Sequence, residues 1–310
     1  MGVSELLQQL RDDKTSGATT LAEQAVEIVE LFVASQVAPD PEKLAASLET
    51  LVGEILTAQP SMAVMIELAR RALDACPADL PLAAGLSSLQ ESLAAFRQEL
   101  RGGTQALCLH ALALFPPDAT VLTYSNSATV TAALRHAVAH GRLGRVLLSE
   151  ARPAYDGRQQ ARALTEAGIS VEYCIDMALF EGLAAADVVI VGADAVFPDT
   201  FVNKVGTHAL AQLAHVRGVP CFALSASNKF LPAGAAGLLR IVEQPSDEVW
   251  PDVNDGVRVR NRYFEETPLA LLRGIVTDRG MQTAETVSAQ LRQHALSPAL
   301  QRLAAKRLQG

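Results

Sequence analysis

The sequence predicts an α/β protein in which a helical N-terminal domain is followed by a doubly wound parallel sheet. Residues 1–102 carry apolar side chains at helical spacing. From Thr120 onward, short and nearly continuous apolar runs alternate with helical segments. Gly102-Gly103 lies between these two patterns, so we place the boundary of a helical domain, 1–102, and an α/β domain, 103–310, at this pair.

The helices of the first domain are expected where apolar spacing and breaker residues agree. Leu6, Leu7 and Leu10 mark the first helix. Thr20 is expected to cap the second, with Glu23 three residues later completing a capping box. Prolines separate the remaining helices, which we expect over residues 42–58, 63–75 and 82–100, with Gly102-Gly103 ending the last one.

The second domain is expected to alternate strands with helices. Its apolar runs are almost unbroken, which is typical of parallel strands that are buried on both faces. Strands are expected at 121–123, 146–149, 171–175, 188–191, 221–224 and 275–277, and helices at 128–140, 157–167 and 203–216.

Composition excludes several classes of function. Of the 310 residues, 49% are hydrophobic and 19% charged, so the chain can bury a large core. The net charge of −8 argues against a nucleic-acid-binding surface and means that any anion site must be a local basic pocket. The cysteines are widely spaced and form no Cys-x-x-Cys pair, so we expect no metal site: Cys76, Cys108, Cys174 and Cys221.

Hydropathy gives no sign of a membrane protein. The first residues do not combine a basic segment with an apolar core, which a signal peptide would need. No apolar run approaches the ~20 residues of a membrane span. We therefore expect a cytoplasmic protein without a membrane partner.

The stretch from Val188 to Thr207 is the strongest functional signal. A buried strand ends in Gly192-Ala193-Asp194, which places a carboxylate where open α/β sheets bind ligands. Asn203 and Lys204 are predicted to open a helix, whose N-terminus attracts anions. Together they predict a site for a phosphorylated small molecule. The alternative is that Asp194 only caps a turn and Lys204 is a solvated helix residue.

Other polar side chains are expected at the same edge of the sheet. Ser125, Asn126 and Ser127 follow the first strand, Arg152 the second and Lys229 the fifth. Cations suit a phosphate, and amides and hydroxyls suit sugar hydroxyls. Arg152 could equally be an ordinary loop charge. Neither a Gly-x-Gly-x-x-Gly motif nor a P-loop is present, so we expect no dinucleotide cofactor and no hydrolysis of nucleoside triphosphates.

Several motifs resemble one superfamily. It contains the alpha, beta and delta subunits of eukaryotic translation initiation factor two-B, the methylthioribose-1-phosphate isomerases and the archaeal ribose-1,5-bisphosphate isomerases. The resemblance implies a Rossmann-like second domain, a sugar-phosphate crevice between the two domains and a homodimer built on the second domain. The motifs that carry it include LTYSNSATV at 122–130, SEARPAYDGRQQARAL at 149–164 and GADAVFPDTFVNKVGT at 192–207.

The resemblance also implies roles for single residues. The isomerase branches carry a catalytic cysteine two residues after the threonine of the first-strand motif, and this position is Ser125 here. Their catalytic aspartate corresponds to Asp194. Their early Gly-Ala pair, which belongs to the substrate site, corresponds to Gly17 and Ala18, but the arginine before it is replaced. A second arginine of the isomerases is replaced by Gln59.

The change from thiol to hydroxyl weighs against an isomerase, and the presence of Asp194, Asn203, Lys204 and Arg152 weighs against an inactive pocket. A cysteine, with a pKa of ~8.5, can exchange protons at neutral pH, whereas a serine hydroxyl needs an adjacent base. The first hypothesis is therefore a protein that binds a sugar phosphate or a nucleoside monophosphate and could act as a sensor. The alternatives are an aldose-ketose isomerase that uses Asp194 with an altered partner, and a structural subunit with an inactive pocket.

Overall fold

The computed structural model describes residues 2–13, 16–35 and 40–309. The chain forms two compact units. The helical unit comprises Met1–Gly102, Asn228–Arg240 and Leu291–Gly310, and the sheet unit comprises Gly103–Ser227 and Ile241–Gln290. The helical unit thus includes two segments from beyond the predicted boundary, and the division into domains 1–102 and 103–310 stays a prediction.

The helical unit buries one apolar stripe of each of its main helices. In α3 (Pro41–Ala58), for example, Leu44, Leu48 and Ile55 are buried, and the Asp40 carboxylate caps the helix by accepting from the Lys43 amide at 2.9 Å. Among the described residues, no helix is both long and apolar enough to cross a membrane. The other helices of this unit are α1 (Val3–Asp12), α2 (Ala18–Ser35), α4 (Ala63–Ala75), the first part of α5 (Leu82–Ala111) and α10 (Pro298–Gln309).

Two expected helix boundaries are wrong. Helix α2 begins at Ala18, so Thr20 lies inside it and cannot cap it. Helix α5 continues through Gly102-Gly103 to Ala111. The reason is burial on both sides of the glycine pair: Leu100 and Leu107 are both buried, and this burial offsets the cost of about 1 kcal/mol that each glycine adds to a helix interior.

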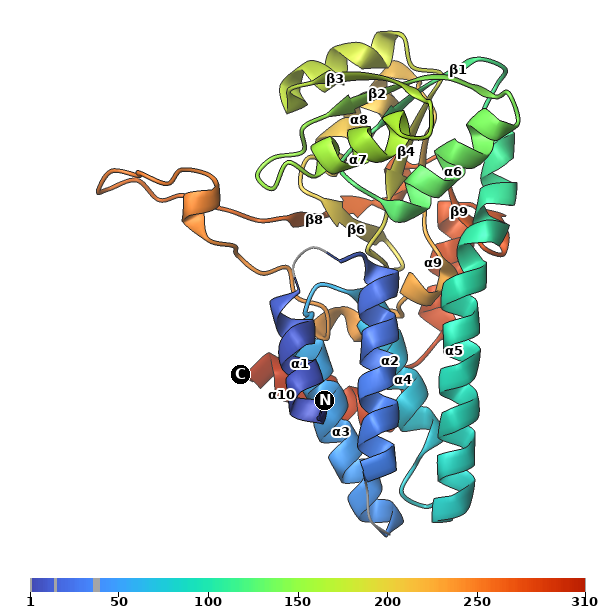
Figure 1. The fold of residues 1–310 in the computed structure, drawn as a ribbon, viewed down its shortest axis with the longest axis vertical. Helices are drawn as coiled ribbons and strands as arrows, with labels where there is room; N and C mark the ends of the chain where they lie inside the picture. Colours follow the sequence, from blue (N-terminus) through green and yellow to red (C-terminus); the bar gives the residue numbers. More distant parts are fainter. Residues whose placement is uncertain (1, 14–15, 36–39, 310) are drawn as a thin grey trace. The chain divides into compact units, whose positions relative to one another are not determined.

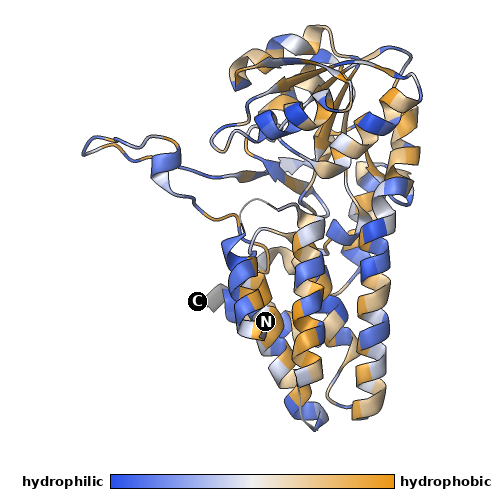
Figure 2. Cartoon of the chain, viewed as in Figure 1, coloured by the Kyte–Doolittle hydropathy of each residue, from blue (hydrophilic) through white to orange (hydrophobic). Residues whose placement is uncertain are grey.

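The described residues of the sheet unit form a seven-stranded sheet in the order β10-β9-β7-β4-β1-β2-β3. All neighbours are parallel except β10, which is antiparallel to β9. Figure 2 shows the central strands as predominantly hydrophobic. The strands are β1 (Ala119–Thr123), β2 (Leu143–Ser149), β3 (Ser170–Cys174), β4 (Val188–Gly192), β7 (Cys221–Leu224), β9 (Gly274–Thr277) and β10 (Gly280–Gln282).

Helices follow β1 and β2 and precede β7, in the alternating pattern that was expected, and Figure 1 shows these helices beside the sheet. A helical N-terminal region followed by a mostly parallel sheet confirms the predicted fold class. The strand order reverses between β1 and β4, which makes their carboxyl ends the place where a doubly wound sheet binds ligands. The helices are α6 (Ala128–Ala139), α7 (Asp156–Thr165), α8 (Thr207–Arg217) and α9 (Ala284–Gln293).

The expected helix over 203–216 is wrong at its start. Asn203 and Lys204 belong to β6 (Thr200–Lys204), which pairs antiparallel with β5 (Ala195–Val196) and β8 (Phe264–Pro268) in a second, three-stranded sheet. Helix α8 begins only at Thr207, after Gly206 has turned the chain with a φ of +105°.

A glycine-to-alanine pair tests the continuity of α5. A Cβ at Gly102 or at Gly141 would meet no atom within 4 Å, but Gly102 is helical and Gly141 has a φ of +64°. We expect Gly102→Ala to raise the free energy of unfolding by about 0.5–1 kcal/mol, because alanine favours a helix. Gly141→Ala, the matched control, should lower it by about 1 kcal/mol, because alanine is strained at positive φ. Urea unfolding followed by circular dichroism measures both. Destabilisation by Gly102→Ala would contradict a continuous helix.

Candidate functional site

The carboxyl ends of β1 and β4 lie side by side because these strands are neighbours in the sheet. Tyr124 to Ser127 follow β1, and Asp194 follows β4. The Asp194 amide donates to the Val202 carbonyl at 2.8 Å, which ties this turn to β6. The structure therefore places Ser125 and Asp194 on the two loops that flank the reversal of strand order, and their catalytic roles stay predictions.

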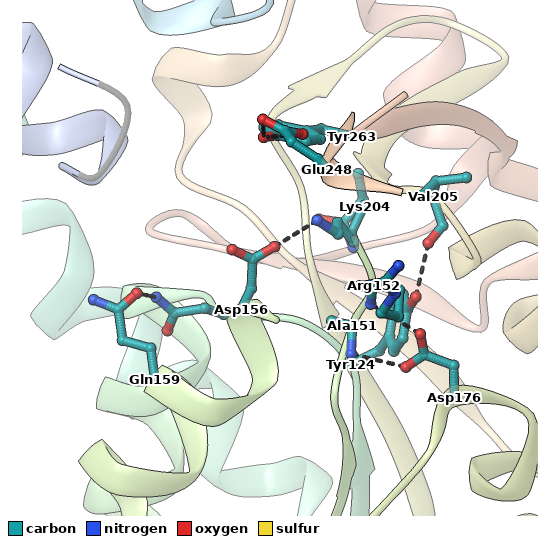
Figure 3. Close-up of polar contacts among 12 residues, drawn as sticks. Tyr124, Ala151, Arg152, Asp156, Gln159, Asp176, Lys204, Val205, Glu248 and Tyr263 are labelled. Carbon is teal, nitrogen blue, oxygen red and sulfur yellow. Dashed lines mark hydrogen bonds and ion pairs between the residues drawn. The ribbon is translucent and has the colours of Figure 1, made fainter. Parts of the chain in front are cut away.

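The loop after β1 is held in an unusual conformation. Ser125 is buried and has a φ of +69°, a region that residues other than glycine seldom adopt. The Tyr124 hydroxyl donates to the Val205 carbonyl at 2.8 Å (Figure 3). Burial raises the pKa of Tyr124, so its hydroxyl remains a neutral donor. The Tyr124 hydroxyl also leaves no room for a side chain at position 206, because a Cβ on Gly206 would lie 2.7 Å from the hydroxyl oxygen.

The next two residues contact α7. The Asn126 amide Nδ2 donates to Gln159 Oε1 at 3.0 Å. Ser127 is the N-cap of α6, where its hydroxyl accepts from the Val130 amide, and its own amide donates to Gln160 Oε1 at 3.1 Å. Gln160 is fully buried, and its Nε2 has no acceptor among the described residues. A buried donor of this kind could serve a ligand or a water molecule.

Lys204 is almost fully buried, with 3% of its surface exposed. Its Nζ lies 2.5 Å from Asp156 Oδ2, in the first turn of α7, and 4.9 Å from the centre of the Tyr263 ring (Figure 3). A buried ammonium needs such a carboxylate and such a ring, because both replace the solvation that it has lost. The neighbouring Asn203 is also buried and donates through Nδ2 to the Thr207 hydroxyl at 2.9 Å.

The N-terminus of α8 is not an open anion site. The amides of Gly206 and His208 both donate to Glu265 Oε1 at 2.8 Å. Glu265 reaches them because β8 pairs with β6, with Glu265 opposite Asn203. The prediction of a phosphate at this helix N-terminus is therefore corrected: a carboxylate of the chain itself occupies the position that favours an anion.

The loop after β2 is organised by a carboxylate. Asp176 accepts from the Ser149 hydroxyl at 2.7 Å and from the amides of Ala151 and Arg152 at 2.8 and 2.9 Å (Figure 3). The guanidinium of Arg152 donates through Nη2 to the Val249 carbonyl at 3.2 Å and lies 4.8 Å from the centre of the Tyr155 ring. Arg152 thus follows its predicted strand, and its guanidinium contacts residues of the same unit.

Tyr263 connects Lys204 to a more distant carboxylate. Its hydroxyl lies 2.7 Å from both carboxylate oxygens of Glu248, and Asn261 Nδ2 donates to the same carboxylate at 2.9 Å. Burial and this carboxylate together raise the pKa of Tyr263. Sequence reasoning missed four residues of the candidate site, because each comes from an element far from Lys204 in the sequence. They are Asp156, Gln160, Tyr263 and Glu265.

The remaining predicted residues belong to the helical unit. Gly17 directly precedes α2, Ala18 is its first residue, and Lys229 lies in the segment Asn228–Arg240. Their roles in binding stay predictions. Gln59, which stands at a predicted arginine position, is buried and donates to the carbonyls of Leu10 and Asp13 at 2.6 and 3.0 Å. Its side-chain amide therefore satisfies backbone carbonyls at the end of α1, and it carries no charge for a phosphate.

The thiols do not form a reactive group. Burial raises the pKa of the Cys221 thiol to about 12 and also raises the pKa values of Cys76, Cys108 and Cys174. Because the thiolate is the nucleophile, a raised pKa lowers the reactivity of these thiols at neutral pH. In the part of the chain that the structure describes, no three His, Cys, Asp or Glu side chains are placed to hold a metal ion.

Comparison with known sequences finds that this chain is similar to proteins described as initiation factors and as isomerases. The sequence model of the Initiation factor 2 subunit family matches residues 14–284. A Pyrococcus horikoshii protein described as a translation initiation factor eIF-2B subunit 2-like is 28% identical over 90% of this chain and 95% of its own. A methylthioribose-1-phosphate isomerase from Gemmatimonas aurantiaca is 36% identical over 63% of this chain and 60% of its own. A ribose 1,5-bisphosphate isomerase from Methanocaldococcus jannaschii is 32% identical over 52% and 54%.

Solved structures show the same architecture. The crystal structure of a Pyrococcus horikoshii translation initiation factor eIF-2B superposes with a TM-score of 0.77 at 27% identity, over 90% of this chain and 96% of that one. A chain from the tetrameric eIF2B-beta2-delta2 complex of C. thermophilum gives a TM-score of 0.70 over 93% of both chains. At 23% identity, this second similarity shows the fold alone.

The ion pair of Lys204 and Asp156 can be tested through stability. Asp156→Ala leaves the ammonium buried without a carboxylate and should lower the free energy of unfolding by about 2 kcal/mol. Lys204→Met should cost less, about 1 kcal/mol, because the Asp156 side chain is 32% exposed and can be solvated. The double variant should be more stable than Asp156→Ala alone. Strictly additive losses in urea unfolding would show that the pair is not coupled.

Proposed function

The chain belongs to the Initiation factor 2 subunit family, and on that premise we propose that it binds a phosphorylated small molecule at the carboxyl ends of β1 and β4. The proposed ligand is a sugar phosphate or a nucleoside monophosphate, and its binding would be regulatory. The observation that carries the proposal is the burial of Lys204 beside these strand ends. Lysine is an effective ligand for phosphate, and a bound phosphate would share the Lys204 ammonium with Asp156.

Two further features support a polar ligand in this place. Gln160 directs its Oε1 to the Ser127 amide and keeps a buried Nε2 that no described residue accepts. Asp194, on the neighbouring loop, supplies an acceptor suited to sugar hydroxyls. Because the Glu265 carboxylate already accepts from the first amides of α8, side chains rather than these amides would have to recognise the phosphate.

Ser125 favours binding over catalysis. An aldose-ketose isomerisation needs one group that exchanges a carbon-bound proton and another that serves the oxygen. Asp194 could fill one of these roles, but a serine hydroxyl ionises too weakly for the other unless a base activates it. The second candidate function is nevertheless an isomerase that uses Asp194 with an altered partner, and the strained backbone of Ser125 favours it.

We further propose that the protein is a cytoplasmic homodimer. Trp250, the only tryptophan of the sequence, is 45% exposed on the sheet unit. Large exposed aromatic side chains are typical of protein interfaces. The eIF2B beta and delta subunits of C. thermophilum form a tetramer, which is a property of that complex.

Thermal-shift measurements test ligand binding. Ribose 5-phosphate or AMP at 100 times its dissociation constant should stabilise the protein by about 2.7 kcal/mol, whereas ribose and adenosine should act only at much higher concentration. Lys204→Met should reduce the ligand-induced shift for the phosphorylated compounds, and Asp194→Asn should reduce it for all of them. Lys43→Met, at an exposed lysine of the helical unit, is the matched control. If none of the pentose phosphates and nucleoside monophosphates shifts the transition, the binding proposal fails. Equal weakening of phosphorylated and unphosphorylated ligands would remove Lys204 as the phosphate ligand.

Turnover measurements separate the two candidate functions. We expect negligible ketose formation by the wild type with ribose 1,5-bisphosphate and with methylthioribose-1-phosphate, because the weak acidity of a hydroxyl adds several kcal/mol to the barrier. Ser125→Cys should gain at most a trace of activity, which Asp194→Asn should then abolish. Ser87→Cys, on the exposed surface of α5, controls for the added thiol. Robust turnover by the wild type would favour the isomerase.

A further inference from the structure

A pocket lies at the root of the arm that residues 241–263 form on the sheet unit (Figure 1). Its volume is about 440 Å³, within the range of about 300–1,000 Å³ that is typical of small-molecule sites. The loop after β2, the residue that follows β6 and both limbs of the arm supply its walls. All of these segments belong to the sheet unit, so this root pocket is formed within one compact unit.

The root pocket carries an excess of positive charge. Three guanidinium groups line it, those of Arg152, Arg260 and Arg262. Of the three, only Arg262 forms an ion pair with a described residue: its Nε donates to Glu243 Oε1 at 2.7 Å, and this bond holds the pKa of that carboxyl below its usual range. The guanidinium of Arg152 donates instead to a neutral acceptor, the Val249 carbonyl, at 3.2 Å. An anionic ligand would balance the two guanidinium groups that lack a carboxylate.

The other walls of the root pocket are apolar. Pro153, Val205 and Val249 supply them, from the loop after β2, the end of β6 and the outgoing limb of the arm. A ligand that is only an inorganic anion would leave these side chains in contact with water. A flat ring would cover them and could also lie on the planar face of a guanidinium group. The walls therefore favour an anion with an aromatic body.

Asn261 adds an unused hydrogen-bond acceptor to the pocket wall. Its side chain is buried, with 3% of the residue exposed. Nδ2 donates to the Pro245 carbonyl at 2.7 Å and to Glu248 Oε2 at 2.9 Å, and these two acceptors fix the orientation of the amide. Oδ1 is buried and has no donor among the described residues. An N–H group of a ligand would satisfy this oxygen, either directly or through one water molecule.

We propose that the root pocket binds an aromatic carboxylate that carries an N–H group. The carboxylate contacts the guanidinium groups of Arg152 and Arg260, the ring covers the apolar walls, and the N–H group serves Asn261 Oδ1. A carboxylate suits the pocket better than a phosphate, because a dianion loses more hydration beside apolar walls. The walls do not include Lys204 or Asp194, so this is a second ligand site that goes beyond the proposed function.

Isothermal titration calorimetry with the full-length chain tests the site, with indole-3-propionate as the probe. We expect one molecule to bind per chain. Benzothiophene-3-propionate, in which sulfur replaces the N–H group, should bind at least about fivefold more weakly, and tryptamine, in which an ammonium replaces the carboxylate, should not bind. Arg260→Ala should weaken binding of the probe about tenfold or more, because it removes a charge-assisted contact. Val249→Asp should do the same by placing a carboxylate in the pocket wall. Arg258→Ala, at an exposed arginine of the same limb outside the walls, is the matched control and should leave the affinity unchanged.

Four outcomes would overturn the site. One is the absence of binding by the wild type at about 1 mM probe. Equal affinity for the indole and benzothiophene compounds would remove the role of the Asn261 oxygen. Equal weakening by Arg258→Ala and Arg260→Ala would show a general effect of charge rather than a contact in the pocket. Loss of binding in Lys204→Met, with Arg260→Ala unaffected, would place the probe in the site proposed beside Lys204. None of these results bears on the thermal shifts with ribose 5-phosphate or AMP, so the two ligand sites can fail independently.

Discussion

The candidate site depends on the pairing of β6 with β8. This antiparallel pair places Asn203 opposite Glu265 and Lys204 opposite Phe264. It removes Asn203 and Lys204 from the following helix and brings the Tyr263 ring over the ammonium of Lys204. It also delivers the Glu265 carboxylate to the first amides of α8. Without this register, Lys204 would be a solvated residue at a helix terminus, and the charge balance of the site would be different.

The sequence was sufficient to predict the parallel sheet, because its central strands are short apolar runs that are buried on both faces, whereas the edge strand β3 is largely exposed. Asp194 was placed at the end of β4 for the same reason. The β6–β8 pair could not be predicted, because it joins segments about sixty residues apart and has no local signature. One local signal was available in the sequence: Gly206 interrupts the expected helix, and glycine readily adopts the positive φ that ends or precedes a helix. The continuity of α5 was missed because burial around Gly102-Gly103 outweighs helix propensity.

The site itself was predicted only in part, because chain order identifies residues at strand ends but not their partners. Asp156, Gln160 and Tyr263 reach the site through side-chain contacts across elements. Membership of the family accounts for the fold of this chain, but it does not establish which ligand the chain binds or which reaction it catalyses. Gln59 stands where the isomerases are expected to carry an arginine, and it serves the end of α1 instead. Together with Ser125, it supports the prediction that the chain keeps the architecture of its relatives without the cysteine and the arginine that the isomerases are expected to carry.

The contact between Tyr124 and Gly206 limits how the site can diverge. A side chain at position 206 would begin 2.7 Å from the Tyr124 hydroxyl, on a backbone that already disfavours any Cβ. Loss of the hydroxyl through Tyr124→Phe would make room but leave the Val205 carbonyl without this donor. The two positions are therefore epistatic: the effect of a substitution at one depends on the residue at the other. Sequence drift in this loop would have to proceed through coupled steps, so the shape of the loop can persist even while neighbouring polar residues are exchanged.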